Sequence, residues 1–400
     1  MRKICLSVIG LFLSFVATFS QTTADTTGYK PRKLTFEEAD LVSSYYRQDG
    51  NNSAVTGGIG TENLNDFSNT IDLKFIRWGA KDVKHTFNLE IGADHYTSAS
   101  SDKIDPYTLS SPSHADTRIY PSLNWMAENA GKSTTVGAGL SFSNEYDYRS
   151  VGANVLFAKK TANRNGEFSA KLQAYLDNLK LIYPIELRTN PARGGREKDD
   201  YASAARNSFS GSFSYSHIIN PQLQVALIAD VVYQQGYLGL PFHRVYFSSG
   251  KVAVENLPDS RLKLPLGFRA NYFLGDKLIL RSFYRFYHDN WGLTAHTAQL
   301  ETAWKLSPFF SLSPFYRYYT QTGVEYFAPY QAHSLSDQYF TSNYDLSSFN
   351  SHFYGAGFRY TPVTGVFHLQ RISALELRYG HYNRGNSLNA DIVSLNLQFK

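Results

Sequence analysis

The chain has 400 residues, and its 39 lysines and arginines against 34 aspartates and glutamates give a formal net charge of +5. This small excess does not indicate a nucleic-acid-binding protein. Aromatic residues are abundant, with 29 tyrosines and 28 phenylalanines, and tyrosine is enriched where one end of a side chain is apolar and the other is wet, as at the rims of membrane barrels.

The first 20 residues have the pattern of a secretion signal. Arg2 and Lys3 form a positive start, residues 6–19 form an apolar run, and small residues lead to a predicted cleavage after Ser20. Cys5, the one cysteine, lies inside this segment, so we expect a mature chain without disulfides or thiol chemistry. Because the signal carries two basic and no acidic residues, the expected mature charge is +3. No later stretch is apolar for about 18 residues, so no transmembrane helix is expected.

Residues 21–39 follow the predicted signal. They are largely polar, contain Pro31 and show no strand pattern. We expect them to form a periplasmic tail that is also the candidate segment for binding a periplasmic partner, and we expect residues 40–400 to form the folded domain.

From residue 40 onward, apolar and polar residues alternate in segment after segment, which is the pattern of strands with one apolar and one polar face. Sixteen such segments occur, at roughly 40–48, 66–78, 83–97, 117–127, 133–144, 147–159, 165–177, 207–219, 221–234, 260–274, 276–289, 292–306, 308–321, 351–362, 371–383 and 389–399. Together with a secretion signal, this pattern predicts an all-β fold, a transmembrane up-and-down antiparallel β-barrel of about 16 strands in the outer membrane.

The connections between these segments support the count. Short connections, such as 129–132, 220–221, 275–276 and 307–308, largely alternate with long ones at 98–116, 178–206, 235–259 and 322–350. Bacterial barrels have short periplasmic turns and longer outer loops, with an even number of strands. Because the connections near 145, 290 and 385 are short on both sides, fourteen or eighteen strands remain alternatives.

The polar faces of the predicted strands are uneven in charge. Because charge facing lipid at the membrane midplane costs about 2–4 kcal/mol, we expect charged side chains to face the lumen. Strands after about residue 260 supply the candidate pore-lining residues Lys263, Arg269, Arg281, Arg285, Arg317, Arg359 and Arg378, together with Glu301. Earlier strands supply the candidates Glu90, Asp94 and Asp230. The sequence therefore predicts a basic wall opposite a more acidic wall.

Two interpretations of these charges remain open, and they can coexist. Arginines inside a barrel often pair with carboxylates or stack on tyrosines, and so fill and stiffen it. Alternatively, opposed charged walls create a transverse field in a water-filled pore, and a basic wall favours anionic solutes. We expect a weak preference for anions if the protein conducts.

Three other segments have more than one interpretation. Residues 98–106 are rich in oxygen ligands and form either a calcium-binding loop or a solvated turn; they lack the regular spacing of a known calcium loop. The aromatic stretch 236–247 is a constriction, a partner-binding surface or a self-packed loop hairpin. The charged stretch 193–200 is either solvated or in contact with anionic lipopolysaccharide.

No catalytic arrangement emerges from the sequence. Ser216 and His217 are adjacent and therefore face opposite sides of a strand. Zinc-protease, serine-hydrolase and phosphate-loop motifs are absent from the sequence. We expect no enzymatic activity, no cofactor and no metal site.

Several stretches resemble one known family: the stretch from residues 29–34 through residues 98–102, the loop 236–247 and the end 388–399. This is domain of unknown function 3570, an uncharacterised family of Gram-negative bacteria. The resemblance covers nearly the whole mature chain and implies an outer-membrane location without an assigned activity. Members are encoded near thioredoxin-like and flavin-transferring proteins, which implies a link to a redox or flavinylation-dependent export system.

The sequence thus favours a porin-like channel for small polar or anionic solutes, surrounded by outer-membrane lipid. The alternative is a non-conducting outer-membrane anchor or a component of a redox- or flavinylation-linked export system.

Overall fold

The structure, a computed structural model, describes residues 32–97, 115–188 and 201–400. The predicted signal peptide, most of the predicted tail and the segments 98–106 and 193–200 lie outside the described residues. Among the described residues, no helix is long and apolar enough to cross a membrane.

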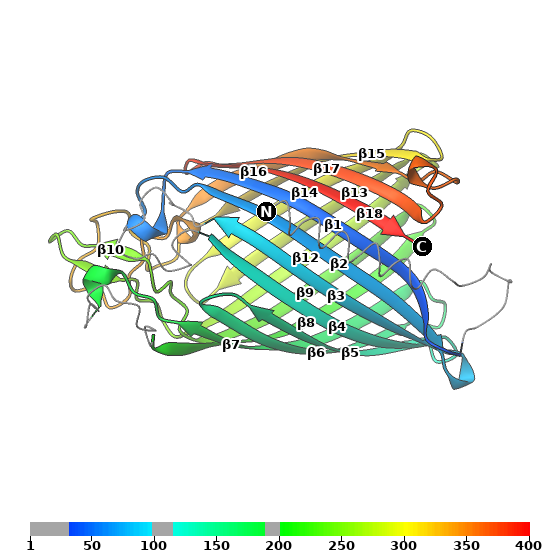
Figure 1. Ribbon diagram of the computed structural model, residues 1–400, viewed down its shortest axis with the longest axis horizontal. Helices are drawn as coiled ribbons and strands as arrows, with labels where there is room; N and C mark the ends of the chain where they lie inside the picture. The colour runs from blue at the N-terminus through cyan, green and yellow to red at the C-terminus, as the bar shows by residue number, and fades with distance from the viewer. Residues whose placement is uncertain (1–31, 98–114, 189–200) are drawn as a thin grey trace.

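A closed antiparallel barrel of sixteen strands forms the body of the protein (Figure 1). The barrel strands are β1 Thr35–Gly50, β2 Leu64–Trp78, β3 Val83–Thr97, β4 Ala115–Asn129, β5 Thr134–Asn144, β6 Tyr148–Lys160, β7 Gly166–Lys180, β8 Ser203–Asn220, β9 Leu223–Gly236, β12 Ser260–Leu274, β13 Leu278–Asp289, β14 Thr294–Lys305, β15 Phe310–Gln321, β16 Phe349–Tyr360, β17 Ile372–Arg384 and β18 Leu388–Phe399. Each pairs with its neighbours in chain order, and β1 closes the barrel by pairing with β18, with Ala39 opposite Phe399. The predicted fold class, a transmembrane up-and-down barrel, is confirmed.

The first strand starts earlier than the alternation indicates. β1 begins at Thr35, inside the segment 21–39 that the sequence assigns to a tail. The register between β1 and β2 shifts between Phe36 and Glu38, where the chain bulges. A bulge places an extra residue in one strand, so it interrupts the two-residue period from which strands are predicted.

The exterior of the barrel carries the apolar residues of each strand. Leu140 of β5 and Leu227 of β9 are 65% and 61% exposed, and many other leucines, valines and aromatic residues on the same face are also exposed. Such a surface is stable against hydrocarbon, while the opposite face of each strand looks into the lumen.

The two ends of the barrel differ. The β10 strand and the long connections 237–259 and 322–348 lie at one end, whereas the C-terminus and the short turns such as 275–277 lie at the other (Figure 1). Three connections at the loop end are short, at 145–147, 290–293 and 385–387, and one connection at the other end is longer, at 361–371. The loop end corresponds to the predicted outer side.

The aromatic stretch 236–247 belongs to a cluster of packed loops, which we call the loop cap: residues 51–63, 237–259 and 322–348. Its β10 strand Arg244–Tyr246 pairs with β11 Val252–Val254. Arg244 donates from Nη1 to the carbonyl of Val55 at 2.7 Å, and the rings of Phe247 and Phe340 meet edge to face at 4.9 Å. The stretch is therefore a hairpin that packs against two other loops.

Candidate functional site: the charged lumen

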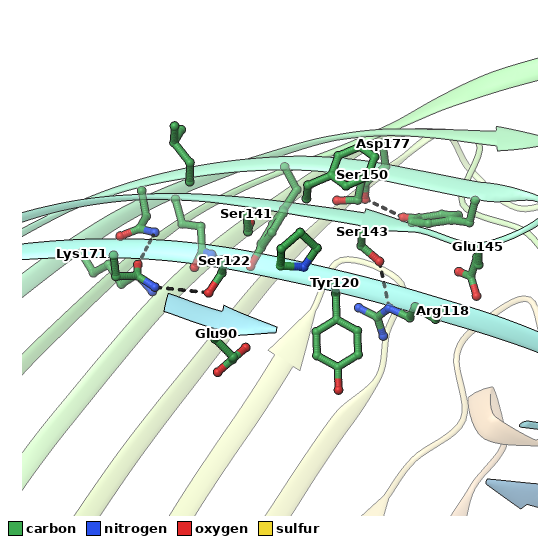
Figure 2. Close-up of a pocket in the computed structure, with 18 residues that line it drawn as sticks. Glu90, Arg118, Tyr120, Ser122, Ser141, Ser143, Glu145, Ser150, Lys171 and Asp177 are labelled. Atoms are coloured by element: carbon green, nitrogen blue, oxygen red, sulfur yellow. Dashed lines mark hydrogen bonds between the residues drawn. The ribbon is translucent and has the colours of Figure 1, made fainter. Parts of the chain in front are cut away.

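One side of the lumen contains a hollow of about 560 Å³ lined by polar side chains of β3 to β7. Figure 2 shows Glu90, Tyr120, Lys171 and Asp177 around it, with serine hydroxyls between them. We call this side, formed by β2 to β7, the acidic wall.

Carboxylates of the acidic wall receive hydrogen bonds from hydroxyl groups. Asp94 accepts from Ser68 Oγ at 2.7 Å and from Tyr120 Oη at 2.9 Å, and Asp177 accepts from Tyr148 Oη at 2.5 Å. Gly92 of β3 makes room for Tyr120, because a Cβ at this position would lie 2.0 Å from the ring. Hydroxyl donors satisfy these two carboxylates without neutralising them. Arg118 and Lys171 line the same hollow and offset part of its negative charge.

The opposite side of the lumen, formed by β12 to β17, is the basic wall, and part of it is a paired cluster. Glu301 of β14 accepts from Arg281 at 2.8 Å and from Arg378 at 2.6 Å. The Arg378 guanidinium also lies 4.4 Å from the centre of the Phe315 ring. Arg359 pairs with Glu376 at 3.5 Å nearer the C-terminal end. These arginines have the packing role that the sequence left open.

Three predicted pore-lining arginines lack such partners. Among the described residues, no carboxylate lies within ion-pair distance of Arg269, Arg285 or Arg317. Arg269 lies over the ring of Phe283 at 5.8 Å and Arg317 over the ring of Phe353 at 4.8 Å. The positive charges of these three arginines therefore have no ion-pair partner on the basic wall.

The remaining predicted residues do not gather into one site. Lys263 is opposite Asp289 in the register of β12 and β13, but Asp289 is bound by Arg261. Asp230 of β9 is opposite Ser212, and Glu90 borders the hollow. Neither Lys263 nor these two carboxylates has an ion-pair partner within the described ranges.

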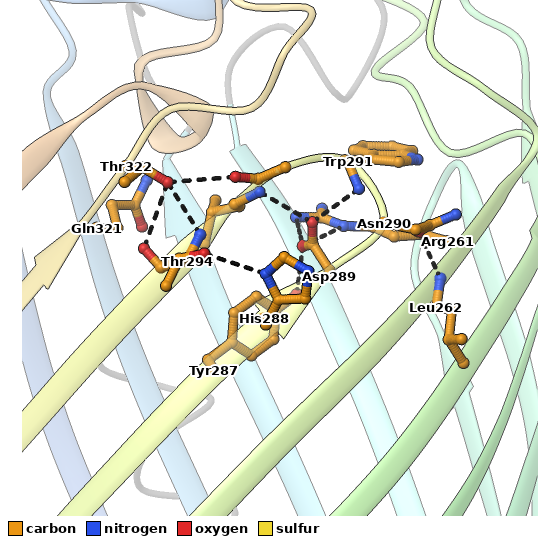
Figure 3. A network of polar contacts seen from close by, with 12 residues as sticks. Arg261, Leu262, Tyr287, His288, Asp289, Asn290, Trp291, Thr294, Gln321 and Thr322 are labelled. Atoms are coloured by element: carbon orange, nitrogen blue, oxygen red, sulfur yellow. Dashed lines mark hydrogen bonds and ion pairs between the residues drawn. The ribbon is translucent and has the colours of Figure 1, made fainter.

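The loop end of the basic wall contains a buried ionic cluster that the sequence did not reveal (Figure 3). Asp289 is 1% exposed and accepts from Arg261 Nε at 2.9 Å and from Tyr287 Oη at 2.6 Å. Its other oxygen accepts from the backbone amides of Trp291 and Leu293 at 2.9 and 3.2 Å. The Arg261 guanidinium lies 4.3 Å from the centre of the Trp291 ring. One carboxylate thus fixes the turn 290–293 to β12.

The loop cap has a polar core that is equally hidden in the sequence. Glu255 accepts from the amide of Leu240 at 2.6 Å and from the hydroxyl of Thr341, and its Oε1 lies 3.4 Å from Nδ1 of His243. Burial raises the pKa of Glu255 to about 7 and lowers the pKa of His243 to about 3. His333 joins the same core through Nε2, which donates to the carbonyl of Thr341 at 2.9 Å.

An acidic group forms where β4 meets the turn between β5 and β6. Potential ligand atoms of Asp116, Glu145 and Asp147 lie within 4.8 Å of one another, and no other group of three or more potential metal ligands occurs in the part of the chain that is described. Burial raises the pKa of the Glu145 and Asp147 carboxyls, and Glu145 accepts a hydrogen bond from Tyr96. The turn 145–147 is the sequence signal that could have located this group.

The sequence model of one family matches residues 78–387, and the family is described as protein of unknown function (DUF3570). The chain belongs to this family. The expected resemblance is therefore confirmed, and the family brings no assigned activity. No curated protein matches the chain.

Several solved barrels are similar in shape. A bacterial polysaccharide outer membrane secretin has a TM-score of 0.43 at 11% identity, covering 90% of this chain and 98% of its own. OccD3 (OpdP) of Pseudomonas aeruginosa has a TM-score of 0.43 at 9% identity, covering 94% and 93%. A BenF-like porin from Pseudomonas fluorescens Pf-5 has a TM-score of 0.42 at 8% identity, covering 93% and 100%. Likenesses this distant carry no inference about the solute of this chain.

Proposed function

We propose that the protein is an outer-membrane channel that lets small polar solutes pass and prefers anions. The observation that carries the proposal is the uncompensated charge of the basic wall, where Arg269, Arg285 and Arg317 have no carboxylate partner within the described residues. Sixteen-stranded barrels are wide enough to hold an aqueous channel. The loop cap at the outer end limits passage to small solutes.

Conductance tests this proposal. Mature protein refolded into planar bilayers should give stable single-channel steps, and under a gradient of potassium chloride the reversal potential should shift toward that of chloride. A shift toward potassium would contradict the anion preference, and the absence of steps in protein that has folded would contradict the channel.

The second candidate function is a non-conducting anchor. The observation that favours it is the loop cap, whose core is closed by Glu255, His243 and Thr341, side chains that are 4%, 0% and 0% exposed. A rigid outer surface of this kind suits attachment of a partner. A role in redox- or flavinylation-linked export would instead use the segment before Thr35, and deletion of residues 22–34 with loss of a periplasmic partner in pull-down would support it.

A further inference from the structure

The three arginines without carboxylate partners lie close together in the sheet. Arg269 of β12 is opposite Phe283 of β13, so Arg285 is its diagonal neighbour on that strand, at about 7–8 Å between Cα atoms. Arg285 is opposite Thr297 of β14, and Arg317 of β15 is opposite Gln299. Arg285 and Arg317 are therefore two strands apart and offset by two residues, about 12 Å between Cα atoms. Arg269 and Arg317 lie in the same register row, three strands and about 14 Å apart. All three lie within the interior of their strands.

This arrangement places unpaired positive charges beside an arginine pair that a carboxylate neutralises. Arg281 and Arg378 share Glu301, whereas Arg285 and Arg317 repel one another electrostatically across β14. Like charges that face each other without a counterion destabilise a fold. A bound anion would remove that cost, as Glu301 does for the neighbouring pair.

Two of the three guanidinium groups lie over aromatic rings. Arg269 and Arg317 lie over the rings of Phe283 and Phe353. A guanidinium that packs its face on a ring keeps its N–H edges free for acceptors. Its fork of donors matches the paired oxygens of a carboxylate or a phosphate.

We propose that Arg269, Arg285 and Arg317 form a binding site for one small oxyanion, a carboxylate or a phosphate, on the basic wall. The site rests on the proposed channel function, since it would be the place where the permeating anion pauses. A defined site differs from non-specific attraction of anions to a charged wall, because binding depends on these three residues. Arg281, Arg359 and Arg378 are excluded from the site, since they already have carboxylate partners.

Equilibrium binding to the refolded mature protein in detergent tests the site, with inorganic phosphate and malonate as separate probes followed by calorimetry. Arg285→Gln and Arg317→Gln should each weaken binding roughly tenfold, the effect of about 1.4 kcal/mol. Arg359→Gln is the matched control, since it removes the same charge from the same wall and should change affinity less than twofold. Resistance of the folded barrel to heat in detergent shows that each variant is folded.

The outcomes separate this site from the channel. Binding that is lost in Arg285→Gln and Arg317→Gln but kept in Arg359→Gln supports the site, whichever of the two probes binds more tightly. Equal losses in all three variants, or no saturable binding to the unmodified protein, would overturn it. Binding without conductance would contradict only the channel, and anion-selective conductance without binding would contradict only the site.

Discussion

The acidic and basic walls of the lumen satisfy their charged groups in different ways. On the acidic wall, neutral hydroxyls serve the carboxylates, as Tyr120 does for Asp94. On the basic wall, most arginines pair with a carboxylate, as at Glu301, or rest on an aromatic ring, as Arg317 does, whereas Arg285 does neither within the described residues. Within the described strands, no ion pair joins the two walls.

We expect this difference to leave a field across the centre of the barrel. If the walls neutralised each other through long ion pairs, the lumen would be filled and its charge cancelled. Because the ion pairs that do form stay within one wall, we expect opposite charges to remain on opposite sides and to act on any solute between them.

The largest expected effect comes from breaking the ionic cluster on the basic wall. Asp289→Ala leaves Arg261 without its carboxylate and two backbone amides without an acceptor. We expect the free energy of unfolding to fall by about 3–5 kcal/mol, measured by urea unfolding of the refolded barrel.

A substitution on the acidic wall gives a stability loss to compare with that of Asp289→Ala. Tyr120→Phe removes one hydrogen bond from a neutral hydroxyl to the Asp94 carboxylate and should cost about 1.5–3 kcal/mol, less than Asp289→Ala. Similar losses in the two variants would show that the walls are stabilised alike and would contradict the contrast drawn between them.

A second expected effect concerns the loop cap, whose stability should depend on pH. The pKa of Glu255 is raised from 4.5 to about 7, so folding of the cap gains stability as the pH falls from 7 to 4.5. The pKa of His243 is lowered from 6.5 to about 3, so stability is lost as the pH falls from 6.5 to 3. The two effects cancel between pH 6.5 and 4.5, and below this range we expect a net loss of about 2 kcal/mol.

Hydrogen exchange at the amides of β10 and β11 would measure this loss. Protection should be flat from about pH 6.5 to 4.5 once the intrinsic rate is corrected, and should drop below that range. In Glu255→Gln the compensating group is gone, so protection should fall from pH 6.5 downward. A flat profile in that variant would contradict the assigned role of His243.

The smallest expected effect concerns ion preference. Glu301→Gln releases the charge of Arg281 and Arg378 into the lumen. One unit charge roughly 7 Å from an ion in water is worth about 0.6 kcal/mol. Because the change favours chloride and disfavours potassium by this amount each, the preference for chloride over potassium should rise roughly sevenfold.

Reversal potentials in a salt gradient would measure this change. Asp94→Asn is the control on the acidic wall, because it also removes one negative charge but frees no arginine. Because one unit charge changes in each variant, we expect similar rises, and a larger rise in Glu301→Gln would show that the pairing at Glu301 matters beyond the total charge of the lumen. No rise in Glu301→Gln would contradict the expectation that lumen charge sets the ion preference.

The sequence by itself determined the sixteen strands, their apolar exterior and the unequal charge of the walls. Each of these follows from the two-residue period of a strand and from chain order, and both are local properties. The sequence pattern missed the early start of β1 because the bulge between Phe36 and Glu38 breaks that period.

Only the tertiary structure decided which charges are neutralised. Arg378 pairs with Glu301 although 77 positions separate them in the chain. Asp289 is bound by Arg261 and not by Lys263, which lies opposite it in the strand register. Such contacts depend on the register between strands and on side-chain direction across the curved lumen, and neither is encoded in a pattern along one strand. The buried core of the loop cap was hidden for the same reason, because Thr341 comes from a different loop than Glu255 and His243.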